Sequence, residues 1–168
     1  MILHCSQKLA AKLHDVSPTP LEEISPLGSW HGNLYRFDRR QCVMLIHDAS
    51  RYVLFLPGMR KAQFEELGTN WFRPSYLASL ATIGCVDTQI TKAELALGPV
   101  RYDRATDRSV HSSLRVAKQD LEAWMYRVPN VMLLDPLLVS RELNDRPATV
   151  YGKWIRPSDV MRNRIAVL

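Results

Sequence analysis

The pattern of apolar and polar residues is clearest in the first third of the chain. Three runs rich in aliphatic and aromatic residues, at 30–37, 41–47 and 51–56, are separated by short polar segments, which predicts three β-strands. Connections this short join neighbouring antiparallel strands, so we expect a β-meander. The second and third runs are apolar at consecutive positions instead of alternating, which is typical of strands buried on both faces. Helices from the rest of the chain, or a second copy of the protein, are therefore expected to cover the sheet.

A helical period marks the long segment 109–127. Apolar residues recur there at steps of four and three, which places them on one face of a helix. These residues are Val110, Leu114, Ala117, Leu121, Trp124 and Val128. The opposite side carries Arg115, Lys118, Gln119 and Glu122. Thr106, Asp107 or Ser109 can cap the first turn, because each offers a side-chain oxygen to the free backbone N–H groups.

Shorter patterns predict the remaining elements. Helices are expected at 6–13, 61–67, 74–83, 88–97 and 135–143, and short strands at 2–5 and 100–104. Gly68 is expected to end the second of these helices. The tail at 151–157 is expected to be irregular or a short strand, and Ser158 to cap a last turn. No repeat or linker divides the chain, so the prediction is a single α+β domain over residues 1–168, with an antiparallel β-meander sheet covered by several helices.

Composition narrows the class of protein without giving its activity. Hydrophobic residues make up 46% and charged residues 23% of the 168 residues, which excludes a disordered, collagen-like or coiled-coil chain. Cys5, Cys42 and Cys85 lie far apart and form no C-x-x-C pair, which argues against a disulfide framework or a thiolate zinc site. No apolar run is long enough to span a membrane, and the N-terminus lacks a signal-peptide pattern. We therefore expect a cytoplasmic protein that has no membrane association.

The basic residues point to an anionic partner. Lys and Arg number 22 against 17 Asp and Glu, a net charge of +5, and 16 of the 22 are arginine. The planar guanidinium pairs with phosphate or carboxylate through two hydrogen bonds, which lysine cannot do. A net charge of this size also serves solubility alone, so it does not identify the partner.

The first candidate site is the basic and aromatic segment 30–40, which comprises the first strand of the expected meander and the turn after it. Arg36, Arg39 and Arg40 fall within five residues and are interleaved with Tyr35 and Phe37. On a strand, Arg36 points away from the two rings, and the other two arginines lie at the turn. Rings and arginines on one sheet can stack bases and pair with phosphates. The alternative is that the rings belong to the core and the arginines are solvated turn charges.

The second candidate site is the start of the long helix. Hydroxyls and backbone N–H groups at a helix start, beside Arg104 and Arg108, are typical of an anion site. His111 could act there as an acid or base, or be a surface residue of a well-capped helix. His47, which precedes Asp48, is the other candidate acid or base. The histidines lack metal-site spacing and no nucleotide-binding glycine motif is present, so we expect no metal and no cofactor.

The order of three motifs resembles an uncharacterised bacterial domain family. The chain opens Met-Ile-Leu-His-Cys-Ser-Gln-Lys-Leu, against M-I-x-x-C-[ST]-x-K-L in the family. Residues 30–34 match W-x-x-N-L, followed by the Arg-Arg pair, and Arg-Ser-Val later matches R-S-V-x-G-S except that Ser112 replaces the glycine. The resemblance implies a fold grouping and a bacterial or mobile-element setting, not a reaction. The residues that match are Asn33, Arg39, Arg40, Arg108 and Ser109.

Three functions remain open from the sequence. The favoured one is a non-enzymatic binding module that holds nucleic acid or an acidic protein surface through an arginine cluster, formed if Arg39, Arg40 and Arg108 converge at one end of the sheet. The second is a regulatory protein, such as a toxin–antitoxin or phage-defence component, that acts by protein–protein contact or as a homodimer. The third is an enzyme on a phosphate-bearing or nucleotide substrate, with His111 or His47 as acid or base. Binding is favoured because no catalytic spacing is present.

Overall fold

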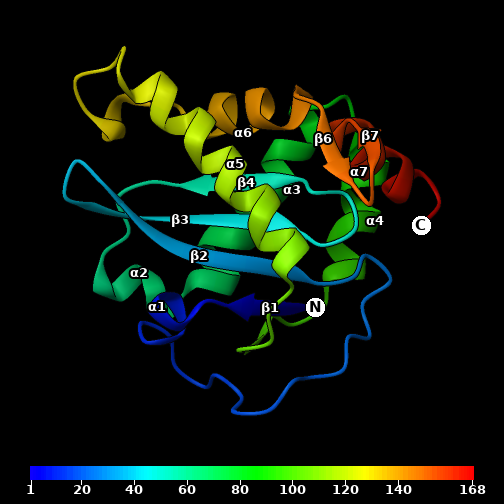
Figure 1. The fold of residues 1–168 in the computed structure, drawn as a ribbon. Helices are drawn as coiled ribbons and strands as arrows, with labels where there is room; N and C mark the ends of the chain where they lie inside the picture. Colours follow the sequence, from blue (N-terminus) through cyan, green and yellow to red (C-terminus); the bar gives the residue numbers. More distant parts are fainter.

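Five strands form the main sheet of the computed structural model, which describes residues 1–168 (Figure 1). The strands are β1 (Ile2–Cys5), β2 (Trp30–Phe37), β3 (Arg40–His47), β4 (Val53–Leu56) and β5 (Arg101–Asp103). Their order across the sheet is β4-β3-β2-β1-β5. The three meander strands and both short strands lie within two residues of their predicted positions.

The predicted α+β class and antiparallel meander are confirmed, but the sheet as a whole is mixed. Strands β2, β3 and β4 form the predicted antiparallel meander. Strand β1, however, pairs in parallel with β2 on one side and with β5 on the other. Parallel neighbours need a connection of about a dozen residues or more, and residues 6–29 supply that length between β1 and β2.

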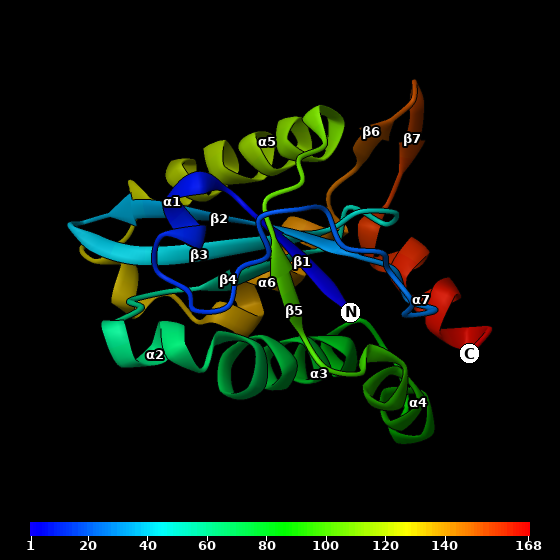
Figure 2. The same cartoon turned by 90° about the horizontal axis from the view of Figure 1, so that it is seen from below.

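The remaining elements are mostly helical. They are α1 (Gln7–Ala10), α2 (Lys61–Glu65), the π-helix η1 (Leu67–Phe72), α3 (Arg73–Thr82), α4 (Asp87–Leu97), α5 (Arg108–Met125), the 3₁₀-helix η2 (Val131–Leu133), α6 (Pro136–Asp145), β6 (Ala148–Val150), β7 (Lys153–Ile155) and α7 (Pro157–Ala166). Helices cover both faces of the sheet, as the apolar strands predict. Figure 2 shows α5 on one side of the sheet and α2, α3 and α4 on the other.

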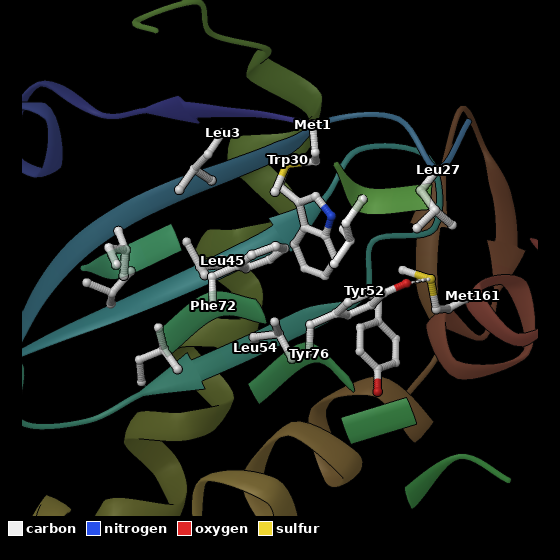
Figure 3. Packing of buried hydrophobic residues seen from close by; sticks show 14 of the residues in the cluster. Met1, Leu3, Leu27, Trp30, Leu45, Tyr52, Leu54, Phe72, Tyr76 and Met161 are labelled. Atoms are coloured by element: carbon white, nitrogen blue, oxygen red, sulfur yellow. Dashed lines mark hydrogen bonds between the residues drawn. The ribbon is translucent and has the colours of Figure 1, made fainter. Parts of the chain in front are cut away.

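The larger of the two cores lies between the sheet and helices α3, α4 and α7. Leu45 and Leu54 point from the sheet into it, and Trp30 occupies its centre (Figure 3). The Trp30 ring meets Phe72 and Tyr76 edge-on, at centroid distances of 5.1 and 5.3 Å. Aromatic pairs in this geometry add about 0.5–1.5 kcal/mol each beyond the area they bury. The second core lies under α5 and α6 on the opposite face.

Gly68 does not end a helix, contrary to the prediction. The chain continues through it as the π-helix η1 into α3. A β-carbon at Gly68 would lie 2.7 Å from the Tyr102 hydroxyl and 2.8 Å from Val100, so the glycine permits a close approach to the segment around β5. Packing, and not a turn, is the reason for glycine at this position.

The tail contains more structure than the sequence pattern predicted. Strands β6 and β7 form a hairpin, and α7 extends over ten residues where only a capped turn was expected. Pro157 at the first helical position and the buried Met161 and Ile165 explain α7, which packs its apolar side on the larger core. None of the helices combines the length and the apolar character that crossing a bilayer requires.

Candidate functional site

Helix α5 forms one wall of the candidate site. Its predicted apolar face is confirmed, and the residues buried against the sheet are Val110, Leu114, Ala117 and Leu121. Of the predicted caps, Asp107 is the one observed, because its carboxylate accepts a hydrogen bond of 3.0 Å from the Val110 N–H. The opposite face of the helix, which carries most of its charge, is therefore directed outward from the core.

His31 ties the start of α5 to strand β2. Its Nε2 accepts a hydrogen bond of 3.1 Å from the backbone N–H of Asp107, so its Nδ1 carries the proton that is shared with Asp48 at 2.6 Å. Burial alone would raise the pKa of the Asp48 carboxyl, but the hydrogen bonds from His31 and Ser29 hold it below its ordinary value. With both nitrogens bonded, His31 positions the helix.

Arg51 forms a second tie to the same helix. It is 3% exposed, and its guanidinium donates to the Ser109 hydroxyl at 3.0 Å and to the backbone carbonyl of Asp48. Ser109, predicted as a ligand-binding residue, therefore already has a partner within the protein. Its observed contact fixes the α5 start over the sheet.

A row of polar side chains crosses three strands beneath the start of α5. The strand register places His4 beside both Asp103 and His31, and the His4 Nδ1 lies 2.6 Å from an Asp103 carboxylate oxygen. Burial acts to raise the pKa of Asp103, but hydrogen bonds from the Leu21 N–H and from His4 lower it below its ordinary value. The ring centroids of His4 and His31 are 4.6 Å apart.

The cavity beside this row is the main candidate site, and we call it the α5–β2 pocket. Its volume is about 520 Å³. Strand β2 contributes Asn33 and Tyr35, and α5 contributes Arg108, His111, Ser112, Arg115 and Lys118. No carboxylate lines the pocket, so its potential is positive. No group of three or more His, Cys, Asp or Glu side chains anywhere in the structure is arranged to hold a metal ion.

The cations of the α5–β2 pocket differ in how they are held. Arg108 and Arg115 are exposed and make no hydrogen bond or ion pair within the protein. Lys118 bonds to Glu122 at 2.5 Å and lies over the Tyr35 ring, 5.7 Å from its centroid. The two arginines are therefore free to pair with a ligand, whereas the lysine is already engaged.

His111 lies at the pocket wall, with its ring 5.2 Å from that of His31. Burial lowers its pKa below the ordinary value. Asp107 and Asp48 act in the opposite direction, but more weakly. No carboxylate or carbonyl orients the His111 ring by a hydrogen bond.

The predicted arginines do not converge, so the expected cluster of Arg39, Arg40 and Arg108 is wrong. The first two lie at the β2–β3 turn and line a separate cavity of about 370 Å³ with Arg60. Asp38 in this turn accepts a hydrogen bond of 2.7 Å from the N–H that opens η2, beyond the end of α5, whereas Arg108 lies at the start of α5. A helix of 18 residues separates the two ends by about 27 Å.

Arg36 also lies outside the pocket. It is exposed, and strand alternation directs it to the face opposite Asn33 and Tyr35, as the sequence predicts. Of the predicted ligand-binding residues, only Asn33 and Arg108 line the α5–β2 pocket, together with the candidate acid–base residue His111.

His47 has a structural role in this fold. It is fully buried, its Nε2 bonds to the Leu27 carbonyl at 2.7 Å, and its Nδ1 lies 2.7 Å from the Ser50 hydroxyl. Burial lowers its pKa to about 4. His47 does not pair with the adjacent Asp48, because Asp48 bonds to His31 on the other face of the sheet.

Sequence reasoning missed several residues of this region, namely His4, His31, Asp103, Arg115 and Lys118. Strand alternation could have placed His31 on the face of Asn33 and Tyr35. The spacing 108, 112, 115 and 118 likewise marks one stripe of the long helix. The contact between that stripe and β2 depends on tertiary packing, for which the sequence carries no local signal.

The fold and the pocket together define an α+β domain with a five-stranded mixed sheet and a basic cavity between β2 and α5. A family model described as "Domain of unknown function (DUF6933)" matches residues 2–160. The chain belongs to this family, which confirms the resemblance to an uncharacterised domain family. No curated protein and no solved structure matches the chain.

Proposed function

We propose that this domain is a non-enzymatic binding module that holds an anionic partner, nucleic acid or an acidic protein segment, in the α5–β2 pocket. One observation carries the proposal: Arg108 and Arg115 are free of internal partners and share with Lys118 and His111 a cavity that no carboxylate lines. Two unpaired guanidinium groups on one helix face are suited to bidentate pairing with carboxylate or phosphate oxygens.

The arrangement of the histidines favours binding over catalysis. A general base needs a free ring nitrogen near the ligand and a second group that orients the ring. His111 lines the pocket but has no orienting hydrogen bond, whereas His31 has one but its other nitrogen accepts from Asp107. Ser112 in the pocket has no base bonded to it, so no activated nucleophile is assembled.

A binding titration with a matched pair of variants tests this function. Fluorescence anisotropy is measured with labelled poly-glutamate and with a labelled single-stranded RNA at low and physiological salt. The double variant Arg108→Ala/Arg115→Ala is expected to bind at least about tenfold more weakly, because each lost charge-assisted hydrogen bond is worth more than 1 kcal/mol.

The control is Arg39→Ala/Arg40→Ala, which removes the same charge at the β2–β3 turn. Its affinity is expected to stay within about twofold. The turn lies near the far end of α5, about 27 Å from Arg108, and charges are screened over about 8 Å at physiological salt. Loss of binding in the control alone would move the site to the turn. An absence of binding by the unaltered protein to both probes at low salt would overturn the proposed function.

A further inference from the structure

Strand β2 has a free edge beside the α5–β2 pocket. Strand β1 pairs with β2 only from Trp30 to Gly32, and the last hydrogen bond across this edge runs from the Ser6 N–H to the Gly32 carbonyl at 2.9 Å. Beyond it the chain turns into α1, while β2 continues to Phe37 with β3 as its only partner. Figure 1 shows β2 running on past the point where β1 ends.

The orientation of the unpaired backbone groups follows from strand geometry. Backbone N–H and C=O groups of alternate residues point to the same side of a strand. Because the Gly32 carbonyl faces β1, the groups of Leu34 and Arg36 face the same edge, and no hydrogen bond of the structure uses them there. Such a row of donors and acceptors is a template for a further strand.

The free edge and the pocket belong to one groove. Asn33 and Tyr35, which alternate with Leu34 and Arg36 along β2, line the pocket from below. The exposed stripe of α5 lines it from the side. Leu9 of α1 packs against Gly32 on the core face of β2, together with Leu3 and Leu45, and the unpaired backbone groups of the edge begin at Leu34.

We propose that this groove binds an extended acidic peptide, which pairs with β2 as a sixth strand and directs its carboxylates to Arg108 and Arg115. This inference rests on the proposed function and names its partner class. Main-chain pairing supplies affinity in strand addition, and the alternate side chains supply specificity. The groove offers both, since unpaired backbone groups lie on one side and unpaired guanidinium groups on the other.

The spacing of the two arginines agrees with a peptide strand. Seven residues separate Arg108 and Arg115, or about 10.5 Å along the helix axis. Alternate residues of an extended strand lie about 6.7 Å apart on one face. Acidic residues two or four positions apart in the peptide therefore lie within reach of two long, flexible arginine side chains.

Nucleic acid fits the same groove less well. Single strands bind through exposed aromatic faces on which bases stack. Two aromatic rings line the pocket: Lys118 lies over the face of Tyr35 at 5.7 Å, and the His111 ring meets that of His31 edge-on at 5.2 Å. A sugar–phosphate backbone also lacks donors and acceptors at the spacing of a β-strand. The backbone N–H and C=O groups of Leu34 and Arg36 would therefore stay unpaired.

Peptide affinity tests the pairing with β2. A labelled peptide of alternating glutamate and threonine is compared with the same peptide N-methylated at every second residue, in each of the two registers, and with single-stranded RNA of equal charge. Methylation in one register is expected to weaken binding at least about tenfold, because it removes the N–H groups that face β2, and methylation in the other register is expected to have little effect.

Hydrogen exchange of the β2 amides measures the pairing of the peptide with this strand directly. The amides of Leu34 and Arg36 are expected to exchange rapidly in the free protein and at least about tenfold more slowly with the peptide bound. The amide of Tyr35, which faces β3, serves as the internal control and should not change.

A pair of substitutions at one residue separates backbone from side chain. Arg36→Pro removes the side chain and also the N–H that faces the free edge, a position where strands tolerate proline. It is expected to weaken peptide binding about tenfold, whereas Arg36→Ala, which keeps the N–H, should bind within about twofold.

The outcomes distinguish this inference from the function on which it rests. Equal affinity of all methylated peptides, with no slowing at Leu34 and Arg36, would overturn strand addition while anion binding stands. Tighter binding of RNA than of the peptide, lost in Arg108→Ala/Arg115→Ala, would overturn the peptide assignment. Absence of binding by every probe would overturn the proposed function itself.

Discussion

Strand β2 carries two different surfaces on one backbone. Trp30 and Gly32 point into the larger core, where aromatic rings and leucines pack without water. His31, Asn33 and Tyr35 point to α5, where the contacts are hydrogen bonds, a cation over a ring and an open cavity. Because side chains alternate along the strand, one face of β2 contributes to the stability of the fold and the other face lines the pocket. Substitutions on one surface should therefore leave the other largely unchanged.

The largest expected effect is on the apolar surface. Trp30→Ala removes a fully buried indole from the centre of the core and is expected to lower the free energy of unfolding by about 3–5 kcal/mol. Asn33→Ala, on the pocket surface, loses only a hydrogen bond to Tyr35 and should cost less than about 1 kcal/mol. Urea denaturation measures both, and equal losses would contradict the separation.

The second effect concerns the one histidine on the apolar surface. His47 lies against Trp30, and burial lowers its pKa from the ordinary 6.5 to about 4. Below pH 6.5 His47 binds a proton in the unfolded chain, whereas in the folded protein it stays neutral until the pH approaches 4. The free energy of unfolding therefore falls as the pH decreases from 6.5 towards 4. Between pH 7 and pH 5 the loss is about 2 kcal/mol.

Denaturation at several pH values measures this loss, and His47→Gln should flatten the dependence. The carboxyls of Asp48 and Asp103 have lowered pKa values and therefore titrate below this window. An unchanged slope in the variant would assign the dependence to another group.

The smallest effect is at the start of α5, on the pocket surface. Asp107→Ala removes the cap on the Val110 N–H and is expected to cost about 1 kcal/mol. The backbone N–H that bonds to His31 remains, so the helix should keep its position. Asp107→Asn, which retains a capping oxygen, should be nearly neutral. Thermal unfolding of the two variants provides the comparison, and a larger loss in the asparagine variant would show that the charge matters more than the cap.

The elements that local patterns define could be predicted from the sequence. The β2–β4 meander and the long helix follow from apolar periodicity and short turns. The parallel insertion of β1 could not be predicted, because its partners at 30–32 and 101–103 lie far away along the chain. The small apolar side of α7 gives a weak periodic signal, which explains why that helix was missed.

The candidate site was predictable only in its parts. Asn33, Arg108 and His111 were singled out, and the structure brings them together. Arg115 and Lys118 were placed on the outer side of the long helix, but the strand that this side borders is set by tertiary packing. Arg39 and Arg40 were expected in the same cluster because they and Arg108 belong to the same series of motifs. The order of motifs along a chain, however, does not give the distance between them in the fold.

The place of β1 also affects how the chain can fold during synthesis. His4 and Asp103 are 99 residues apart in sequence, yet their side chains are in contact across neighbouring strands. Strand β1 therefore lacks its partner on this side until residues 101–103 have been synthesised. Non-local pairing of this kind slows folding, and until then the β5 edge of β1 remains open to other chains. A nascent chain that ends before residue 101 therefore exposes an unpaired strand edge, the kind of surface through which chains aggregate.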